Sequence, residues 1–465
     1  MARRTRGRRS DEPAPDEPTA VYLLGPDGKA EVDQPPAARF RGLGRGWPVL
    51  TVTAALAVLL VAAVIAHDDP DRASDVTPPP APSSPSDLTA PTVLRSTPPT
   101  TALPPWPTTA AACGGEVSLP VLSDVGRLDA ATGVRVVAGN TPRLVDVDAG
   151  ASTTLPVRLT PDELVIELAS DPQGTVALIA SCLGTGAGDS MPTRLVRLAP
   201  DGSRYELSAR APGFAPGSLI SGGDLTWLSR WPVQADGDYL AEAPMQLAPT
   251  IAGASPVRLP KGFIPRGGFR GLIIGNKWLP DGETNGPVEV FDLATRRVIA
   301  RFGSPDVSYT VDNGRVVWAS ASCIGRCAVH VEDLADGTTR TVWARLDQGR
   351  SVGYGAISTD GAMASFLTYN NPPDPHFAGD HPAGPTGIAV LDLATGRMTD
   401  VPGIQLAPKS SITLSFAGKD HWLVLPIGLA EESRILMWRP GLAHPVDAGV
   451  GLPGRPDYSS PLTVA

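Results

Sequence analysis

The sequence is poor in cysteine and histidine, with 4 and 6 of them among 465 residues. It also lacks a G-x-S-x-G nucleophile elbow, a phosphate-binding glycine loop and an H-E-x-x-H helix, so the common signatures of hydrolases and nucleotide-binding proteins are missing. No cofactor is predicted. An enzyme whose site is assembled from scattered loop residues is not excluded, because such a site leaves no local motif.

Charge is absent from one long stretch, Trp47 to Ala66, whose length of about 20 residues fits one helical crossing of a lipid bilayer. Arginines precede it and an acidic segment follows. The positive-inside rule therefore places the N-terminus in the cytoplasm and the rest of the chain outside the plasma membrane. A cleaved secretory signal is the alternative, since Val64–Ala66 has the small-residue pattern of a cleavage site, but the long preceding segment favours an anchor. Both interpretations export the C-terminal part.

The chain divides into four predicted segments. Residues 1–46 mix arginines with Asp/Glu/Pro repeats, which predicts a disordered cytoplasmic tail, and the absence of Cys and His there excludes a zinc-binding anti-sigma module. Within the tail, Val21–Gly28 is either a chance apolar patch or a segment that docks on a partner as an added strand. Residues 47–66 form the transmembrane helix, 67–112 an extended Pro/Ser/Thr-rich linker, and 113–465 a globular domain.

The exported region is acidic, and the whole chain carries a net charge of −9. This argues against nucleic acid as a partner and favours neutral or cationic ones.

The exported domain lacks any long apolar pattern of period 3.6, and short β-rich runs separated by Gly, Asp, Asn and Pro predict an all-β fold. A glycine precedes an apolar strand seven times, at Gly133, Gly174, Gly223, Gly275, Gly314, Gly361 and Gly418. A second strand with a short polar turn follows in each unit, at 143–148, 194–202, 245–249, 288–295, 329–337, 388–396 and 435–440. Repeats of roughly 40 to 50 residues with four short strands are typical of β-propeller blades, so we expect seven blades, with six or eight as alternatives.

The segment Ile357–Gly361, followed by Ala364–Phe366, resembles the turn and strand of WD40-like and TolB-type propeller repeats. Weaker similarity occurs at Asp171–Gly174 and Asp312–Gly314, whereas the Gly-His and Trp-Asp dipeptides of true WD40 repeats are absent. The whole chain resembles actinobacterial membrane-anchored propeller proteins. This resemblance implies the fold and little about activity, because propellers carry many unrelated functions.

Loop lengths give the first functional indication. If strands are lettered A to D from the centre outward, the C–D turns are short, whereas five B–C connections are long and irregular. These are 183–191, 229–243, 279–287, 369–387 and 426–432. All B–C loops of a propeller emerge on one face, so this face becomes the candidate binding site.

The candidate ligand-binding residues of this face are acids and aromatics, a combination that suits a cationic peptide, a sugar or a calcium ion. They are Trp231, Asp236, Asp238, Tyr239, Asp374, His376, Asp380 and His381, accompanied by Asp189, Asp281, Glu283, Phe377, Glu431 and Glu432. A solvated rim with turn-forming aspartates is the simpler alternative. The densest group, Asp374 to His381, includes two histidines, but its spacing matches no established metal-ligand motif and no metal site is predicted.

All four cysteines lie on the predicted exported side, where disulfides persist. Cys323 and Cys327 flank Gly325 at a predicted B–C loop, and Cys182 ends the equivalent strand of the second unit. We expect the pairs Cys323–Cys327 and Cys113–Cys182, although four cysteines allow three connectivities.

Two classes of function remain. The favoured hypothesis is a non-enzymatic binding or scaffolding module that contacts a cell-envelope protein or carbohydrate through its loop-rich face. The alternative is an exported hydrolase or lyase that uses carboxylates or a metal around Asp374, Asp380 and His381. A sensor that relays binding to the tail is a third possibility, for which a single helix offers no evident two-state element.

Overall fold

The computed structural model describes part of the chain: residues 22–24, 30–31, 108–110, 113, 116–182, 190–234, 239–240, 243–278, 285–303, 307–347, 350–369, 385–406, 411–429, 432–453 and 459–465. No helix within these ranges is long and apolar enough to cross a membrane. The predicted transmembrane segment 47–66 lies outside the described residues, so the membrane anchor stays a prediction.

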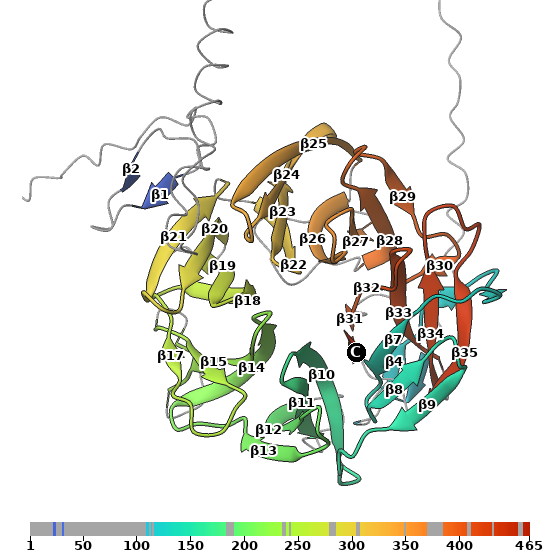
Figure 1. The fold of residues 1–465 in the computed structure, drawn as a ribbon, viewed down its shortest axis with the longest axis horizontal. Coiled ribbons are helices and arrows are strands. Elements are labelled where there is room, and N and C mark those ends of the chain that lie inside the picture. Colours follow the sequence, from blue (N-terminus) through green and yellow to red (C-terminus); the bar gives the residue numbers. More distant parts are fainter. Residues whose placement is uncertain are drawn as a thin grey trace, which may run out of the picture. The chain divides into compact units, whose positions relative to one another are not determined.

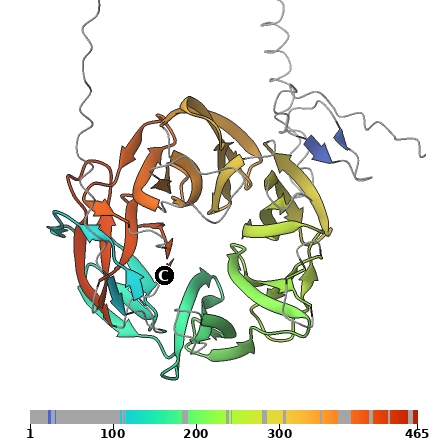
Figure 2. The same ribbon diagram turned by 180° about the vertical axis from the view of Figure 1, so that it is seen from behind.

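Seven four-stranded antiparallel sheets form a ring, as predicted. The four strands of each sheet lie side by side, with the first nearest the central axis and the last at the outer edge (Figure 1). The reverse view shows the same arrangement (Figure 2). In A-to-D order the blades are: blade 1, β37 (Leu462–Val464), β7 (Arg135–Ala138), β8 (Arg143–Asp146) and β9 (Ala151–Thr154); blade 2, β10 (Glu163–Asp171), β11 (Gly174–Cys182), β12 (Ser190–Leu198) and β13 (Arg204–Ser208); blade 3, β14 (Phe214–Ser221), β15 (Thr226–Pro232), β16 (Gln246–Pro249) and β17 (Val257–Arg258); blade 4, β18 (Phe263–Phe269), β19 (Leu272–Trp278), β20 (Asn285–Asp292) and β21 (Arg297–Phe302); blade 5, β22 (Val307–Asp312), β23 (Arg315–Ser320), β24 (Gly325–Asp333) and β25 (Thr338–Leu346); blade 6, β26 (Arg350–Ile357), β27 (Met363–Tyr369), β28 (Pro385–Asp392) and β29 (Met398–Asp400); blade 7, β32 (Ser415–Ala417), β33 (Trp422–Gly428), β34 (Glu432–Trp438) and β35 (Val446–Pro453).

The hydrophobic core lies between the blades rather than within one layer. Successive residues of a B strand, such as Ile273 and Ile274 in β19, are both fully buried because each face of the sheet packs on a neighbouring blade. The B and C strands therefore read as continuous apolar runs. This explains why the predicted segments correspond to the B and C strands in all seven blades.

One predicted turn glycine is wrong. Gly275 lies inside β19, and the turn before that strand uses Gly271, which has a φ of +82°. A Cβ at Gly275 would lie 2.1 Å from the carbonyl oxygen of Ile264, so this glycine is needed for close strand approach. The three segments that resemble TolB-type repeats all form A–B turns, with φ of +120° at Gly174, +73° at Gly314 and +71° at Gly361.

Both predicted disulfides are present. Cys113 is bonded to Cys182 at the end of β11, and Cys323 is bonded to Cys327 across the B–C connection of blade 5. No free cysteine occurs among the described residues.

The inner strands of four blades contain β-bulges. Pairing with the B strand shifts between Val165 and Glu167, between Pro216 and Leu219, between Pro265 and Gly267, and between Arg350 and Gly355. The inner strand of blade 5, β22, pairs with β23 without a shift. A bulge adds a residue on one strand and redirects its side chain, which matters for the centre of the ring.

Two short strands before the predicted anchor, β1 (Tyr22–Leu24) and β2 (Ala30–Glu31), form a hairpin on the outer edge of blade 4, where Tyr22 is opposite Arg301 and Leu23 opposite Ala300. Of the apolar segment singled out in the tail, Tyr22–Leu24 thus form a strand. A cytoplasmic tail cannot pair with an exported blade of the same chain, so this pairing and the predicted topology exclude each other.

The ring is closed by residues from both ends of the exported domain. The C-terminal β37 supplies the innermost strand of blade 1, and β6 (Gly126–Arg127) pairs in parallel with β35 at the outside of blade 7. Leu462 in β37 is 3% exposed and belongs to the core cluster shared by blades 1 and 7.

Truncating this closing strand should destabilise the whole ring. We expect Leu462→Ala to lower the free energy of unfolding by about 2–4 kcal/mol, because it removes a buried side chain from a packed core. Val464→Ala is the matched control in the same strand, since Val464 is 37% exposed and should change stability little. Urea unfolding of both variants measures the difference, and equal midpoints would contradict closure through β37.

Candidate functional site

The long loops predicted to form a binding face do connect B to C strands, in blades 2, 3, 4, 6 and 7. Most of the predicted ligand-binding residues lie outside the described residues: Asp236, Asp238, Asp374, His376, Asp380 and His381, and with them Asp189, Asp281, Glu283, Phe377 and Glu431. Their grouping stays a prediction. Glu432 is described, and its carboxylate accepts a hydrogen bond from Arg434 at 2.8 Å at the start of β34.

The two predicted aromatic residues of this face, Trp231 and Tyr239, are in contact. Their rings meet edge to face with centroids 6.1 Å apart, and Trp278 approaches Trp231 in the same way at 6.3 Å. Trp231 and Trp278 lie at the ends of the B strands of blades 3 and 4. This aromatic trio is therefore on the B–C face between two blades, and Trp278 is a member that the loop lengths did not predict.

Local backbone pairing positions the trio. Tyr239 forms an isolated bridge with Val233, and the Leu240 N–H donates to the Pro232 carbonyl at 2.9 Å, which folds the loop back onto the end of β15. Trp231 packs partly into the core of blades 3 and 4, whereas Tyr239 is 63% exposed. An anchored ring beside an exposed ring is an arrangement that protein interfaces use at binding hot spots.

The aromatic trio adjoins the bulge in the inner strand of blade 3. A Cβ at Gly217 would lie 2.6 Å from Ser229 Oγ and 3.0 Å from Trp231 Nε1, so only glycine fits beneath this tryptophan. Ser229 Oγ accepts from the Ser218 N–H at 2.9 Å and donates to the Ser218 carbonyl at 3.0 Å, which fixes the bulge.

The same bulge is held from blade 2 by Glu167. Its carboxylate accepts a hydrogen bond from the Leu219 N–H and interacts with the Ser218 side chain. Loss of hydration raises the pKa of Glu167 to about 7. The hydrogen bonds from Leu219 and Ser218 lower the pKa, but by less than burial raises it. Glu167 is a group that sequence reasoning missed, because an acid inside a β strand is usually a solvated residue.

Two histidines among the described residues, His330 and His421, have structural partners. His330 stacks on Trp318 with centroids 4.1 Å apart, and burial lowers its pKa. His421 Nε2 lies 2.7 Å from an Asp360 carboxylate oxygen and links the A–B turns of blades 6 and 7. Across the described ranges, no three His, Cys, Asp or Glu side chains are grouped as a metal ion would require.

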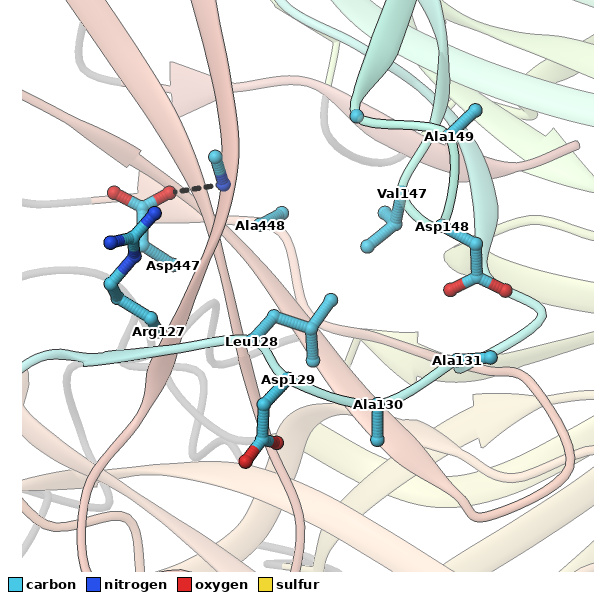
Figure 3. A pocket seen from close by; sticks show the side chains of 12 residues that line it. Arg127, Leu128, Asp129, Ala130, Ala131, Val147, Asp148, Ala149, Asp447 and Ala448 are labelled. Carbon is cyan, nitrogen blue, oxygen red and sulfur yellow. Dashed lines mark hydrogen bonds between the residues drawn. The ribbon is translucent and has the colours of Figure 1, made fainter.

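A hollow of about 590 Å³ lies at the ring-closure seam, between β35 and the C–D turn of blade 1 (Figure 3). C–D turns are on the opposite face from the B–C loops. Two of its three carboxylates are engaged: Asp148 accepts from the Thr132 and Gly133 N–H groups at 2.7 Å, which lowers its pKa, and Asp447 accepts from Arg434 at 3.0 Å. The third carboxylate in the lining is that of Asp129. The hollow is part of the ring closure.

Comparisons with known proteins concern the fold. No family model matches the sequence, and no curated protein matches it either. Among solved structures the chain is similar to TolB from Acinetobacter baumannii, at 15% identity over 72% of this chain and 68% of that one, with a TM-score of 0.34. It is also similar to the periplasmic gluconolactonase PpgL of Pseudomonas aeruginosa, at 14% identity over 71% and 99%, with a TM-score of 0.42. A puromycin hydrolase matches at 14% identity over 74% and 56%, with a TM-score of 0.43.

The TolB match agrees with the resemblance seen in the sequence at the level of the propeller fold. At these identities the likeness extends no further, so activity and partners must be argued from the residues of this chain.

The raised pKa of Glu167 predicts a pH-dependent stability. A carboxyl whose pKa rises from 4.5 to about 7 on folding contributes stability that is complete below pH 4.5 and is lost as the pH rises through 7. We therefore expect Glu167→Gln, which keeps an acceptor for Leu219, to be more stable than the parent at pH 8 by on the order of 1–3 kcal/mol. The difference should vanish near pH 4.5 in urea unfolding.

Glu163→Gln is the control with the opposite sign. A hydrogen bond from Arg194 lowers the pKa of Glu163 to about 2 despite partial burial. The ionised Glu163 therefore contributes folding stability that is present above pH 4.5 and is lost as the pH falls through 2. This variant should be less stable than the parent at pH 8. If both substitutions shifted stability in the same direction at pH 8, the assignment for Glu167 would be wrong.

Proposed function

We propose that the chain is a single-pass membrane protein whose exported propeller binds a cell-envelope polymer or protein through its B–C face. In the membrane-inserted protein β1 would then lie in the cytoplasm and would not pair with β21. The observation that carries this proposal is the aromatic trio Trp231, Tyr239 and Trp278, with one ring exposed on the face that the long loops share. An exposed aromatic ring packed on a partly buried one supplies contact area at low entropic cost. This arrangement favours a binding function over a catalytic one.

The enzymatic alternative, a hydrolase or lyase around Asp374, Asp380 and His381, rests on residues outside the described part of the chain. No contact of the described residues favours the enzymatic hypothesis.

Tyr239→Ala tests the binding face without disturbing the core, because this side chain is largely exposed. We expect the full-length protein in detergent to bind purified cell-wall polysaccharide, measured by co-sedimentation. Tyr239→Ala should weaken this binding about tenfold or more, the usual effect of truncating an aromatic hot spot. Trp231→Ala should weaken it at least as much.

Tyr205→Ala and Trp343→Ala are matched controls, since both aromatics are exposed on outer strands, β13 and β25, away from the B–C face. They should leave binding unchanged. Equal losses in all four variants would indicate non-specific adsorption, and no loss in any of them would contradict the proposed face.

The membrane topology is tested with single introduced cysteines, because all four native cysteines are paired in disulfides. We expect Ser84→Cys in the linker to react with a membrane-impermeant maleimide on intact cells. Thr19→Cys in the tail should react only after permeabilisation. Labelling of Thr19→Cys on intact cells would contradict the topology and would instead agree with the pairing of β1 with β21.

A further inference from the structure

Arg266 is the residue inserted at the bulge of β18. Pro265 and Gly267 on either side of it are paired with Gly275 and Ile274, whereas Arg266 itself has no partner in β19. Its neighbours Pro265 and Gly267 are buried and Arg266 is exposed. In a regular strand, side chains alternate between the two faces of the sheet and so point at the two adjacent blades. A residue inserted at a bulge departs from this alternation, and we infer that Arg266 extends toward the axis of the ring.

The positive charge of Arg266 acts on the phenol of Tyr309 on β22. Tyr309 Oη donates a hydrogen bond to Asn276 Oδ1 at 2.8 Å, which fixes the phenol against blade 4. Burial raises the pKa of Tyr309, so the phenol stays neutral and does not cancel the positive charge. Among the described residues no carboxylate forms an ion pair with Arg266, in contrast to Arg301 on the outer strand of the same blade.

Tyr354 joins this group from blade 6. It lies in the bulge of β26 with a φ of +57°, a conformation that costs energy for an aromatic residue, and it is 53% exposed. Tyr354 and Arg266 both act electrostatically on Tyr309, so the three side chains lie near one another.

Glycines fix the backbone beneath Tyr354. A Cβ at Gly353 would lie 2.7 Å from Ser308 Oγ, and a Cβ at Gly355 would overlap the carbonyl oxygen of Ser365. The strained position of Tyr354 is therefore imposed by close contacts on both sides, one with blade 5 and one with β27 of its own blade.

From this geometry we propose that Arg266, with Tyr354 and positioned by Tyr309, binds an oxyanion at the centre of the ring. A planar guanidinium with several N–H donors, beside a phenolic hydroxyl, suits a carboxylate or phosphate group. The predicted exported region is acidic overall, so a cation that forms no ion pair with a carboxylate of the described residues confers selectivity for one anionic group rather than general attraction. The site is independent of the aromatic trio and stands whether or not the proposed function holds.

The test uses the full-length protein in detergent and isothermal titration with inorganic phosphate or with acetate, at constant ionic strength and pH 7. We expect at least one of the two to bind. Arg266→Gln should weaken its binding about ten- to a hundredfold, because it removes charge-assisted hydrogen bonds. Arg266→Lys should give intermediate affinity, because it keeps the charge and loses the planar set of N–H donors. Tyr309→Phe should also weaken binding.

Arg258→Gln, an exposed arginine on β17, is the matched control and should bind as the parent does. Binding of phosphate alone identifies a phosphate site and binding of acetate alone a carboxylate site, and either supports the proposal. If neither anion bound the parent protein, or if Arg266→Gln bound as tightly as the parent, the proposal would be overturned.

Discussion

Side chains on the inner strand of one blade accept hydrogen bonds from backbone N–H groups on the inner strand of the next blade. These N–H groups have no partner within their own sheet. Bulges create these unpaired groups. Glu167 accepts from Leu219, and Thr310 Oγ1 accepts from Gly355 at 3.1 Å while donating to its carbonyl at 2.8 Å. Asp312 accepts from Ile357 at 3.1 Å just beyond the bulge. Because a buried unpaired N–H costs a few kcal/mol, these bonds make the bulges of blades 3 and 6 dependent on the preceding blade and tie blade 2 to blade 3 and blade 5 to blade 6.

A buried ion pair plays the same part at the A–B turn of blade 2. Asp171 and Arg197 form two hydrogen bonds of 2.7 Å, Asp171 also accepts from the Thr226 N–H at 2.6 Å, and Arg197 donates to the Thr250 carbonyl at 2.9 Å. Each of the two charged groups is thus hydrogen-bonded to its partner and to a neighbouring blade, which is the condition under which a buried pair is tolerated. The polar groups between blades therefore specify the angle at which the blades meet, while the apolar clusters supply most of the burial.

The sequence was sufficient to predict the blades and not the interior of the ring. B and C strands are apolar on both faces and are introduced by turn glycines, so their repeat can be read directly. The inner strands lack this pattern, since β32 and β37 have only 3 residues each and four others are interrupted by bulges. The glycines beside Arg266 and Tyr354 were an available signal, because glycine within a strand often marks a bulge. Gly275 illustrates the opposite error, in which a strand glycine was taken for a turn.

Of the candidate binding face, loop length grouped Trp231 with Tyr239, and their rings are in contact, while ligand binding by this face stays a prediction. Trp278, which contacts Trp231, was not among the predicted residues, since periodic spacing cannot distinguish the last residue of a strand from one inside it. Arg266 was missed for a different reason: nothing local shows that a strand residue lacks a partner.

The Cys113–Cys182 bond determines how the ring responds to mechanical load. The chain enters the domain at Cys113, and this bond joins that point directly to β11 in blade 2. Tension applied upstream is therefore transferred to a central strand through a covalent bond. The weakly held segment that follows, up to the parallel pairing of β6 with β35, is bypassed. A propeller held on a tether can in this way be pulled from its N-terminal side without the seam being peeled open.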